Sequence, residues 1–282
     1  MYNYTIYHPV KISGRGLYTG INSTITIYPE LPHVGIYFLR TDLTDYPIVP
    51  IIPSTLLVLN SKLSTVLGFH DDYSIMLIEH LMSAISLSQL TDLKIILEGP
   101  EIPILDGSSI IWLKLLQQAK IYITSLSNCI IFKSSCTFFI QTKDTFIISF
   151  PYTSLAINTG IDFKNCLAIK SQWITILDLL INRFELVGIA SSRTFGDFNQ
   201  INILINEGFF QGANLYNALA FQLGNWCNGP LRFICEPAKH KVLDLIGDLR
   251  LLGVYNMFFL IGYKTNHFVN SQLVQFFKKL DK

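Results

Sequence analysis

The stretch His240-Lys241-Val242-Leu243-Asp244-Leu245-Ile246-Gly247-Asp248 decides how this chain folds. It lies in a segment, 237–252, whose pattern predicts a helix. His240 and Asp244 are four residues apart, so both side chains lie on one helix face, and Asp248 continues that stripe one turn further on. The other residues are largely apolar. The helix therefore combines a core-forming pattern with ionisable groups that need partners if they are buried.

A second apolar stretch carries ionisable groups about 160 residues earlier in the chain: Ile75-Met76-Leu77-Ile78-Glu79-His80-Leu81-Met82. We expect a helix over 74–87, with Ser74 as its N-cap. Glu79 and His80 would then lie among Ile, Met and Leu side chains. A bound metal ion is the commonest device that makes such a buried cluster tolerable, so the two stretches together indicate a metal site between two halves of the chain.

His80, His240 and Asp244 match the three protein ligands of a catalytic zinc site, in which a fourth position stays open. Glu79, beside one of these ligands, has the chemistry of a general base. His267 follows a predicted strand and can act as a general acid or stabilise an oxyanion.

The residues also allow less specific interpretations. Spacing alone fits a surface helix with a polar stripe, or a helix held by salt bridges. A lone histidine in an apolar helix is often a hydrogen-bonded core residue, and His267 could be an ordinary loop histidine. His70 is close enough to His80 in sequence to be an alternative ligand.

Composition restricts the class of protein. The 282 residues are 50% hydrophobic and 15% charged, which leaves ample material for a core, and the formal net charge is +1. We expect no nucleic-acid partner, because neither the bulk charge nor a basic run favours one. The apolar stretch 251–263 is too short to span a bilayer, so we expect no stable membrane insertion. We expect a monomer in the cytoplasm, or in a plastid or other organelle, since the Ile- and Asn-rich bias is typical of AT-rich genomes.

Strands mixed with a few helices in both halves predict the α+β class. A polar linker at 124–128 suggests an N-terminal domain, 1–126, and a C-terminal domain, 127–282. The predicted strands cover 4–12, 22–28, 34–40, 93–97, 129–140, 144–150 and 256–263. The predicted helices cover 74–87, 110–119, 173–184, 237–252 and 269–280.

The chain resembles the UDP-3-O-acyl-N-acetylglucosamine deacetylase family, the zinc enzymes of the committed step of lipid A synthesis. The resemblance rests on motifs that follow one another in order along nearly the whole chain: Ser13-Gly14-Arg15-Gly16-Leu17-Tyr18-Thr19-Gly20, Glu79-His80-Leu81-Met82-Ser83-Ala84, Gly99-Pro100-Glu101-Ile102-Pro103-Ile104-Leu105-Asp106-Gly107-Ser108, Ser192-Arg193-Thr194-Phe195-Gly196, Pro230-Leu231-Arg232-Phe233, Glu236-Pro237, and 240–249. It implies two similar α+β halves, each a mixed or antiparallel sheet with helices. The helices would be sandwiched between the two sheets, with the site at the domain junction.

The resemblance also implies roles for individual residues. One Zn²⁺ per chain, with Fe²⁺ as the alternative metal, would be held by His80, His240 and Asp244. The catalytic residues would be Glu79 as base, His267 as acid, Thr194 on the oxyanion and Asp248 orienting His267. The UDP-linked acyl aminosugar would contact Lys241, Phe195 and Leu63. An insert near 197–216 would border a passage for the acyl chain.

The chain departs from the family pattern at four places: Tyr18 in place of His, Met76-Leu77-Ile78 in place of Ser-Thr-Val, Tyr216 in place of an acidic residue, and Thr265-Asn266 in place of a small residue and Gly. These positions spare the expected ligands, base and acid. Three alternatives stay open: a decayed relative that binds a nucleotide sugar or a partner without turnover, a structural protein with a salt-bridge network, and an enzyme with another substrate.

Overall fold

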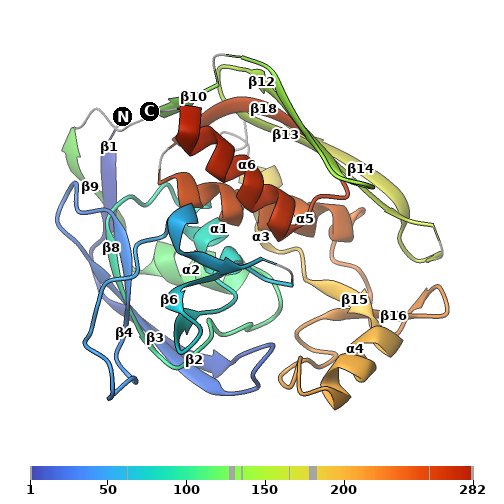
Figure 1. Ribbon diagram of the computed structural model, residues 1–282, viewed down its shortest axis with the longest axis horizontal. Coiled ribbons are helices and arrows are strands. Elements are labelled where there is room, and N and C mark those ends of the chain that lie inside the picture. Colours follow the sequence, from blue (N-terminus) through green and yellow to red (C-terminus); the bar gives the residue numbers. More distant parts are fainter. Residues whose placement is uncertain are drawn as a thin grey trace.

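The computed structural model describes residues 2–61, 63–126, 131–134, 136–164, 166–177, 183–253 and 255–280. These residues form an α+β fold in which helices lie between two larger sheets (Figure 1). The helices are α1 (Glu79–Leu87), α2 (Ile110–Gln118), α3 (Arg183–Ala190), α4 (Phe198–Asn206), α5 (Glu236–Leu249) and α6 (His267–Leu280), with short 3₁₀ turns η1 (Thr55–Leu57) and η2 (Arg250–Leu252). The predicted fold class is confirmed.

The first half of the chain forms one larger sheet and two smaller ones. The larger sheet has the order β2-β3-β8-β4, antiparallel except for the parallel pair β4–β8. Its strands are β2 (Val10–Arg15), β3 (Asn22–Pro29), β8 (Leu93–Glu98) and β4 (Ile36–Arg40). The smaller sheets are β1 (Tyr2–Ile6) with β9 (Ile121–Leu126), and β5 (Val58–Asn60), β6 (Val66–His70) and β7 (Tyr73–Ile75).

The second half forms the other large sheet, with the order β11-β12-β18-β13-β14 and β10 paired to β18. Its strands are β10 (Ile131–Lys133), β11 (Phe138–Gln141), β12 (Phe146–Pro151), β18 (Tyr255–Tyr263), β13 (Leu155–Phe163) and β14 (Lys170–Ile176). A small sheet beside α4 contains β15 (Phe195–Asp197), β16 (Leu219–Gln222) and β17 (Asn225–Trp226).

One hydrophobic core runs through both halves. Its buried side chains come from both large sheets and from α1, α2, α5 and α6. Helix α1 packs against α5, and α5 in turn packs against α6 and β13. Twelve of the fourteen residues of α5 are buried, all except Lys239 and Lys241. The surface-helix interpretation of 237–252 is therefore wrong, because this helix is the centre of the molecule (Figure 1).

Most predicted elements are confirmed with small shifts at their ends. These are 22–28, 34–40, 93–97, 110–119, 144–150, 237–252, 256–263 and 269–280. Pro237 stands in the first turn of α5, and Gly253, with φ +70°, closes η2 as expected for a left-handed stop. None of the helices in the residues described is long and apolar enough to cross a bilayer.

Three predicted elements, 4–12, 74–87 and 173–184, are wrong in part. The strand expected over 4–12 is two strands, which pair with different partners. The helix expected over 173–184 is strand β14 as far as Ile176, because its alternating side chains pair with β13, and α3 begins only at Arg183. Residues 178–182 lie outside the described residues. So do 129, 130 and 135 of the predicted strand over 129–140, whose remaining residues contain β10 and β11.

The helix expected over 74–87 starts five residues later than predicted. Ser74 belongs to β7, and its hydroxyl donates to the Asp71 carbonyl at 2.8 Å instead of capping a helix. The linker expected at 124–128 is also partly wrong, since Thr124 lies in β9. Residues 127 and 128 lie outside the described part, and the division into domains at 126/127 stays a prediction.

Candidate metal centre and active site

The site lies where α1 crosses α5. The two helices approach closely because Gly247 has no side chain at the crossing: a Cβ there would lie 2.1 Å from the Glu79 carbonyl oxygen. Glu79 and His80 are the first two residues of α1. The close approach brings them opposite His240 and Asp244 on α5, so residues far apart in sequence meet in one buried cluster.

His80, His240 and Asp244 can each turn one donor atom toward a common point. Their donor atoms lie within 4.8 Å of one another. Asp244 Oδ1 is 3.4 Å from His240 Nε2 and 3.8 Å from His80 Nε2. Two atoms that bind one tetrahedral ion at 2.0–2.1 Å are about 3.3 Å apart, so the separations suit a shared metal better than a direct hydrogen bond.

The protonation states also fit a metal. Burial, aided by neighbouring His240, lowers the pKa of His80 to about 3, and burial lowers the pKa of His240 as well. Both imidazoles are therefore neutral, with a lone pair to offer. Burial opposes the ionisation of Asp244, but His240 and Lys241 outweigh it and hold the pKa of this carboxyl well below its usual range. All three residues are in the form that binds a cation.

A buried carboxylate oxygen without a hydrogen bond makes the case for an ion stronger. Asp244 Oδ1, which the Nε2 atoms of His80 and His240 approach, is buried and has no hydrogen-bond partner among the described residues. An uncompensated carboxylate oxygen in a protein interior is costly. By contrast, His240 Nδ1 donates to the Ser192 carbonyl at 3.0 Å, which fixes the tautomer and leaves Nε2 free toward Asp244. The residues present fit a bound divalent cation.

Glu79 lies beside this cluster without being one of its ligands. Its side chain is buried, and Oε2 accepts a hydrogen bond from the Thr65 N–H at 3.1 Å. Burial is the main cause that raises the pKa of this carboxyl to about 7, opposed by His267 and supported by Asp248 and Asp244. A carboxyl that gains and loses a proton near neutral pH suits general-base chemistry.

His267 faces Glu79 from the first residue of α6. Its Nε2 is 3.5 Å from Glu79 Oε1, and its Nδ1 donates to Asp248 Oδ2 at 2.8 Å. Burial disfavours the charged ring, but Asp248 and Glu79 outweigh burial and raise its pKa to about 10. The ring is thus an imidazolium at neutral pH. Asn266, one of the departures from the family pattern, caps α6 by accepting the Val269 N–H at 3.1 Å.

Thr65 is a site residue that the sequence interpretation missed. Its N–H binds Glu79, and its hydroxyl donates to Asp248 Oδ1 at 2.6 Å. One buried residue therefore holds both the expected base and the partner of His267. Its sequence offers little signal, because threonine in a polar loop is common. Only its position two residues after the expected contact Leu63 could have drawn attention to it.

Lys241 and Phe195 lie at the edge of the cluster. Lys241 Nζ is 3.0 Å from Asp244 Oδ2, and the Lys241 side chain is about a quarter exposed. Its ammonium lies 6.0 Å from the centre of the Phe195 ring, which stands nearly perpendicular to the His240 ring. Both line a cavity of about 440 Å³ on the β15 side of the site, together with Phe163, Lys164, Cys166, Gly196, Asp197, Gln200 and Phe221. The cavity is both aromatic and cationic.

The remaining predicted residues are Thr194, Leu63 and the alternative ligand His70. Thr194 is fixed by its backbone, which bonds Gly107 and Leu219 at 2.8 Å, and it stands two residues after the carbonyl that binds His240. Leu63 is 45% exposed, at the rim of the loop that contains Thr65. The alternative ligand His70 is exposed on β6, outside the cluster, and its ring packs at a tilt against the Tyr46 ring.

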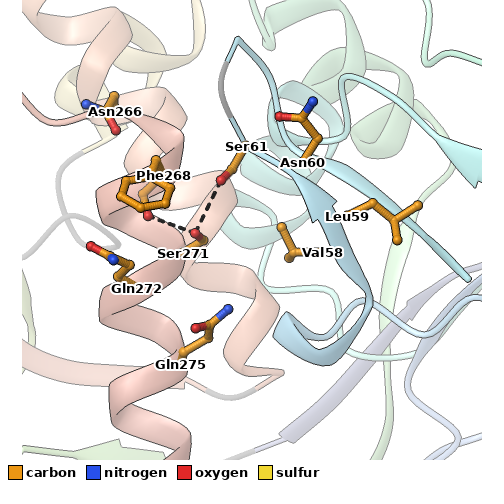
Figure 2. Close-up of a pocket in the computed structure, with 9 residues that line it drawn as sticks. All are labelled: Val58, Leu59, Asn60, Ser61, Asn266, Phe268, Ser271, Gln272 and Gln275. Carbon is orange, nitrogen blue, oxygen red and sulfur yellow. Dashed lines mark hydrogen bonds between the residues drawn. The ribbon is translucent and has the colours of Figure 1, made fainter. Parts of the chain in front are cut away.

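A second cavity, of about 590 Å³, opens between β5 and α6 (Figure 2). Residues 58–61 line one side of it, and the other side is lined by Asn266, which precedes α6, and by Phe268, Ser271, Gln272 and Gln275 of α6. The hydroxyls of Ser61 and Ser271 are 3.5 Å apart. The lining combines amides, hydroxyls and one ring, without a charged side chain. None of the predicted catalytic or metal residues lines it.

A cluster of two neutral histidines and one ionised aspartate, beside a carboxyl and an imidazolium, suits a metal-assisted hydrolase. Comparison with known proteins narrows this class. Residues 3–279 match the family model described as LpxC: UDP-3-O-acyl N-acetylglycosamine deacetylase. The chain belongs to this family, whose members are hydrolases of an amide bond, and the resemblance inferred from the motifs is confirmed.

Individual relatives agree with the family model. A UDP-3-O-acyl-N-acetylglucosamine deacetylase of Synechocystis sp. is 36% identical, over 96% of this chain and 97% of the relative. The protein of the same name from Nostoc sp. is 34% identical over 98% of both chains. The one from Chlamydia caviae is 32% identical over 95% of this chain and 94% of its own.

Proposed function

We propose that the protein hydrolyses the N-acetyl group of UDP-3-O-acyl-N-acetylglucosamine, releasing acetate and UDP-3-O-acyl-glucosamine. This would be the committed step of lipid A biosynthesis. The observation that carries the proposal is the juxtaposition of Glu79 and His267, 3.5 Å apart, beside the buried cluster of three metal-binding residues. The substrate is taken from the names of the relatives, which match almost end to end.

His80, His240 and Asp244 would hold one metal ion, which supplies a Lewis acid beside the scissile carbonyl when bound. Two imidazoles and one carboxylate suit Zn²⁺ best, and Fe²⁺ is the alternative that this donor set also accepts. The Ser192 carbonyl and the Lys241 ammonium would support the ligands from behind, through His240 Nδ1 and Asp244 Oδ2.

Glu79 would act as the general base. Its carboxylate accepts a proton from the attacking water through Oε1, while the Thr65 N–H holds the other oxygen, Oε2. Burial raises its pKa to about 7, so it is basic enough to take the proton and ionised in a large fraction of molecules at neutral pH. A general base works best when its pKa lies near the operating pH, which is the case here.

His267 would act as the general acid. As an imidazolium it stabilises negative charge on the carbonyl oxygen, and then gives its Nε2 proton to the leaving amine. Asp248 keeps the ring charged and oriented, because it accepts a hydrogen bond from Nδ1–H while Asn270 and Thr65 donate hydrogen bonds to its carboxylate. The Thr194 hydroxyl would donate a further hydrogen bond to the same oxygen.

The cavity beside β15 would receive the nucleotide part of the substrate. Lys241 and Lys164 offer positive charge for a diphosphate, and the aromatic rings offer stacking surface. Leu63, Phe195 and the insert near 197–216 would border the acyl chain. A smaller cavity of about 110 Å³, lined largely by apolar side chains of α4 and of residues 213–220, supports this placement.

We further propose that the protein works as a monomer, in the cytoplasm or in a plastid stroma. All the residues of the proposed mechanism come from one chain, so the site is complete without a partner copy. The cyanobacterial relatives and the AT-rich type of composition support a plastid as the second location.

Acetate release from UDP-3-O-acyl-N-acetylglucosamine by the purified protein tests the proposal. We expect release that a chelator abolishes and added Zn²⁺ restores, with metal analysis of the untreated protein deciding between zinc and iron. Absence of release from folded, metal-loaded protein would instead favour the relative that binds the nucleotide sugar without turnover. Release that is insensitive to the chelator would show that the reaction does not need a metal ion.

A further inference from the structure

The loop between β2 and β3 is the place where the two halves of the chain meet beside the site. A buried carboxylate, Glu101, holds this loop by accepting the N–H groups of Tyr18 and Thr19 at 2.8 and 2.9 Å. Gly16 lies against the same carboxylate, where a Cβ would approach Oε2 to 2.3 Å. The loop is therefore fixed from the inside, and the Tyr18 side chain has a defined direction.

The insert docks onto this loop through its backbone. The Gln211 N–H donates to the Tyr18 carbonyl and the Gly212 N–H to the Leu17 carbonyl, both at 3.0 Å. The approach is so close that a Cβ on Gly212 would lie 1.9 Å from the Gly16 carbonyl oxygen. The segment that follows α4 is thereby attached to the N-terminal half.

The Tyr18 side chain reaches the loop that contains Leu63 and Thr65, which contacts the site. Its hydroxyl donates to the Leu63 carbonyl at 2.8 Å, and its ring lies 4.7 Å from the Phe210 ring. The same small core contains Leu17 and Leu77, the latter from the turn that precedes Glu79. One side chain therefore touches the Leu63 loop with its polar end and the insert with its ring.

We propose that Tyr18 is a positioning residue that sets acyl-chain selectivity by holding the Leu63 loop against Phe210 of the insert. The inference rests on the proposed function, because Leu63 and the insert border the acyl chain in that proposal. Without the phenol hydroxyl, the Leu63 carbonyl loses its partner and the loop is free to move away from the insert. Tyr18, Leu63 and Phe210 are not among the residues that line the proposed nucleotide cavity.

Kinetics of Tyr18→Phe on the metal-loaded enzyme test the proposal. Loss of one neutral hydrogen bond corresponds to a change of about fivefold. We expect KM for the substrate with a long fatty acyl chain to rise about fivefold, with kcat changed by less than about twofold. For the analogue with an acetyl group in place of the fatty acyl chain, both constants should stay the same. Equal losses on both substrates, or no loss on either, would overturn the proposal.

Tyr37→Phe is the matched control, since it removes a phenol hydroxyl that binds Glu30, a residue outside the site. It should leave the selectivity unchanged. Amide hydrogen exchange on the free protein gives a readout that does not depend on turnover. We expect faster exchange at Ser64, Thr65 and 210–212 in Tyr18→Phe but not in Tyr37→Phe. Unchanged exchange in Tyr18→Phe would show that Tyr18 does not hold the Leu63 loop against the insert, and would overturn the proposal. Failure of the wild-type protein to release acetate would overturn the proposed function alone.

Discussion

Helices α5 and α1 supply the cluster in two different ways. In α5 the ionisable residues His240, Asp244 and Asp248 follow the helix repeat, and the helix is regular over fourteen residues. In α1 the two residues with proposed roles, Glu79 and His80, stand at the very start of the helix, directly after a turn. That turn contains Leu77 at φ +61°, an unusual backbone conformation for a bulky residue.

The two helices position the side chains of the cluster by different means. Helix α5 positions its side chains by its own regular geometry. The start of helix α1 is positioned by its surroundings. Met76 exchanges backbone hydrogen bonds with Pro100 and Ile102, and Leu77 packs beside Leu17. The absence of a side chain at Gly247 leaves room for the Glu79 backbone. We therefore expect α5 to tolerate changes in its surroundings better than α1 does.

The largest effect is expected from Glu79→Gln, which removes the proposed general base on α1 and leaves the proposed metal ligands unchanged. We expect kcat to fall by about 10²–10⁴, because removal of a general base typically costs that much. The metal should remain, since its proposed ligands are intact. Steady-state kinetics with metal analysis checks both, and Glu98→Gln, at an exposed position on β8, is the control. A variant with wild-type kcat would remove Glu79 from the mechanism.

The next effect is expected from Gly247→Ala, which breaks the contact between the two helices. The added methyl group would lie 2.1 Å from the Glu79 carbonyl, so α1 must shift away from α5. We expect a loss of about 1–3 kcal/mol in the free energy of unfolding, typical of overpacking, and at least a roughly tenfold loss in metal affinity.

Denaturant unfolding and metal titration measure these quantities. Gly188→Ala is the matched control, because an added methyl group there meets only the flexible end of Lys239, at 3.1 Å. If Gly247→Ala binds metal as the wild-type does, then the close approach of the helices does not set the site.

Asp248→Asn tests whether α5 controls the charge of His267. In the metal-free protein we expect the pKa of His267 to fall from about 10, by about one to three pH units, when the adjacent negative charge is removed. The stability linked to the charged ring is present in full below about pH 6.5, the ordinary value for histidine, and is lost as the pH rises through about 10. The variant should therefore lose more stability at pH 6 than above pH 10.

NMR titration of the histidine ring and unfolding at several pH values check this prediction. A His267 pKa that stays the same in Asp248→Asn would show that Glu79 or Asp244 holds the charge instead.

A smaller effect is expected at Thr65, which joins the two helices through Glu79 and Asp248. Thr65→Val removes the hydroxyl bond to Asp248 but keeps the backbone bond to Glu79. We expect kcat to fall by about fivefold, which corresponds to one hydrogen bond of about 1 kcal/mol. Thr65→Ser keeps the hydroxyl and should stay close to wild type. Equal kcat in both variants would assign Thr65 a purely structural part.

The sequence predicts what depends on local periodicity. The α5 stripe, the Gly253 stop and the paired strands of both sheets follow from alternation, helix spacing and turn residues. The apolar run before Glu79 is compatible with a helix. Only the pairing of β7 with β6, and of Met76 with residues near Pro100, makes it a strand and a turn. Tertiary contacts overrode local propensity there.

The same limit applies to the site. Ionisable residues in apolar stretches identify His80, His240 and Asp244, whose grouping the structure reveals. Thr65, Glu101 and Tyr18 act through backbone groups and loop contacts, which leave no spacing pattern in the sequence.

We propose that α1 and α5 share one metal ion while Glu79 stays outside the ligand set. The measurement to make is the metal content per folded chain in His80→Ala, His240→Ala and Glu79→Gln, beside the wild-type protein. We expect one metal ion per chain in the wild type and in Glu79→Gln, and a strong loss in both histidine variants. Full metal content in His80→Ala, or loss of metal in Glu79→Gln, would contradict it.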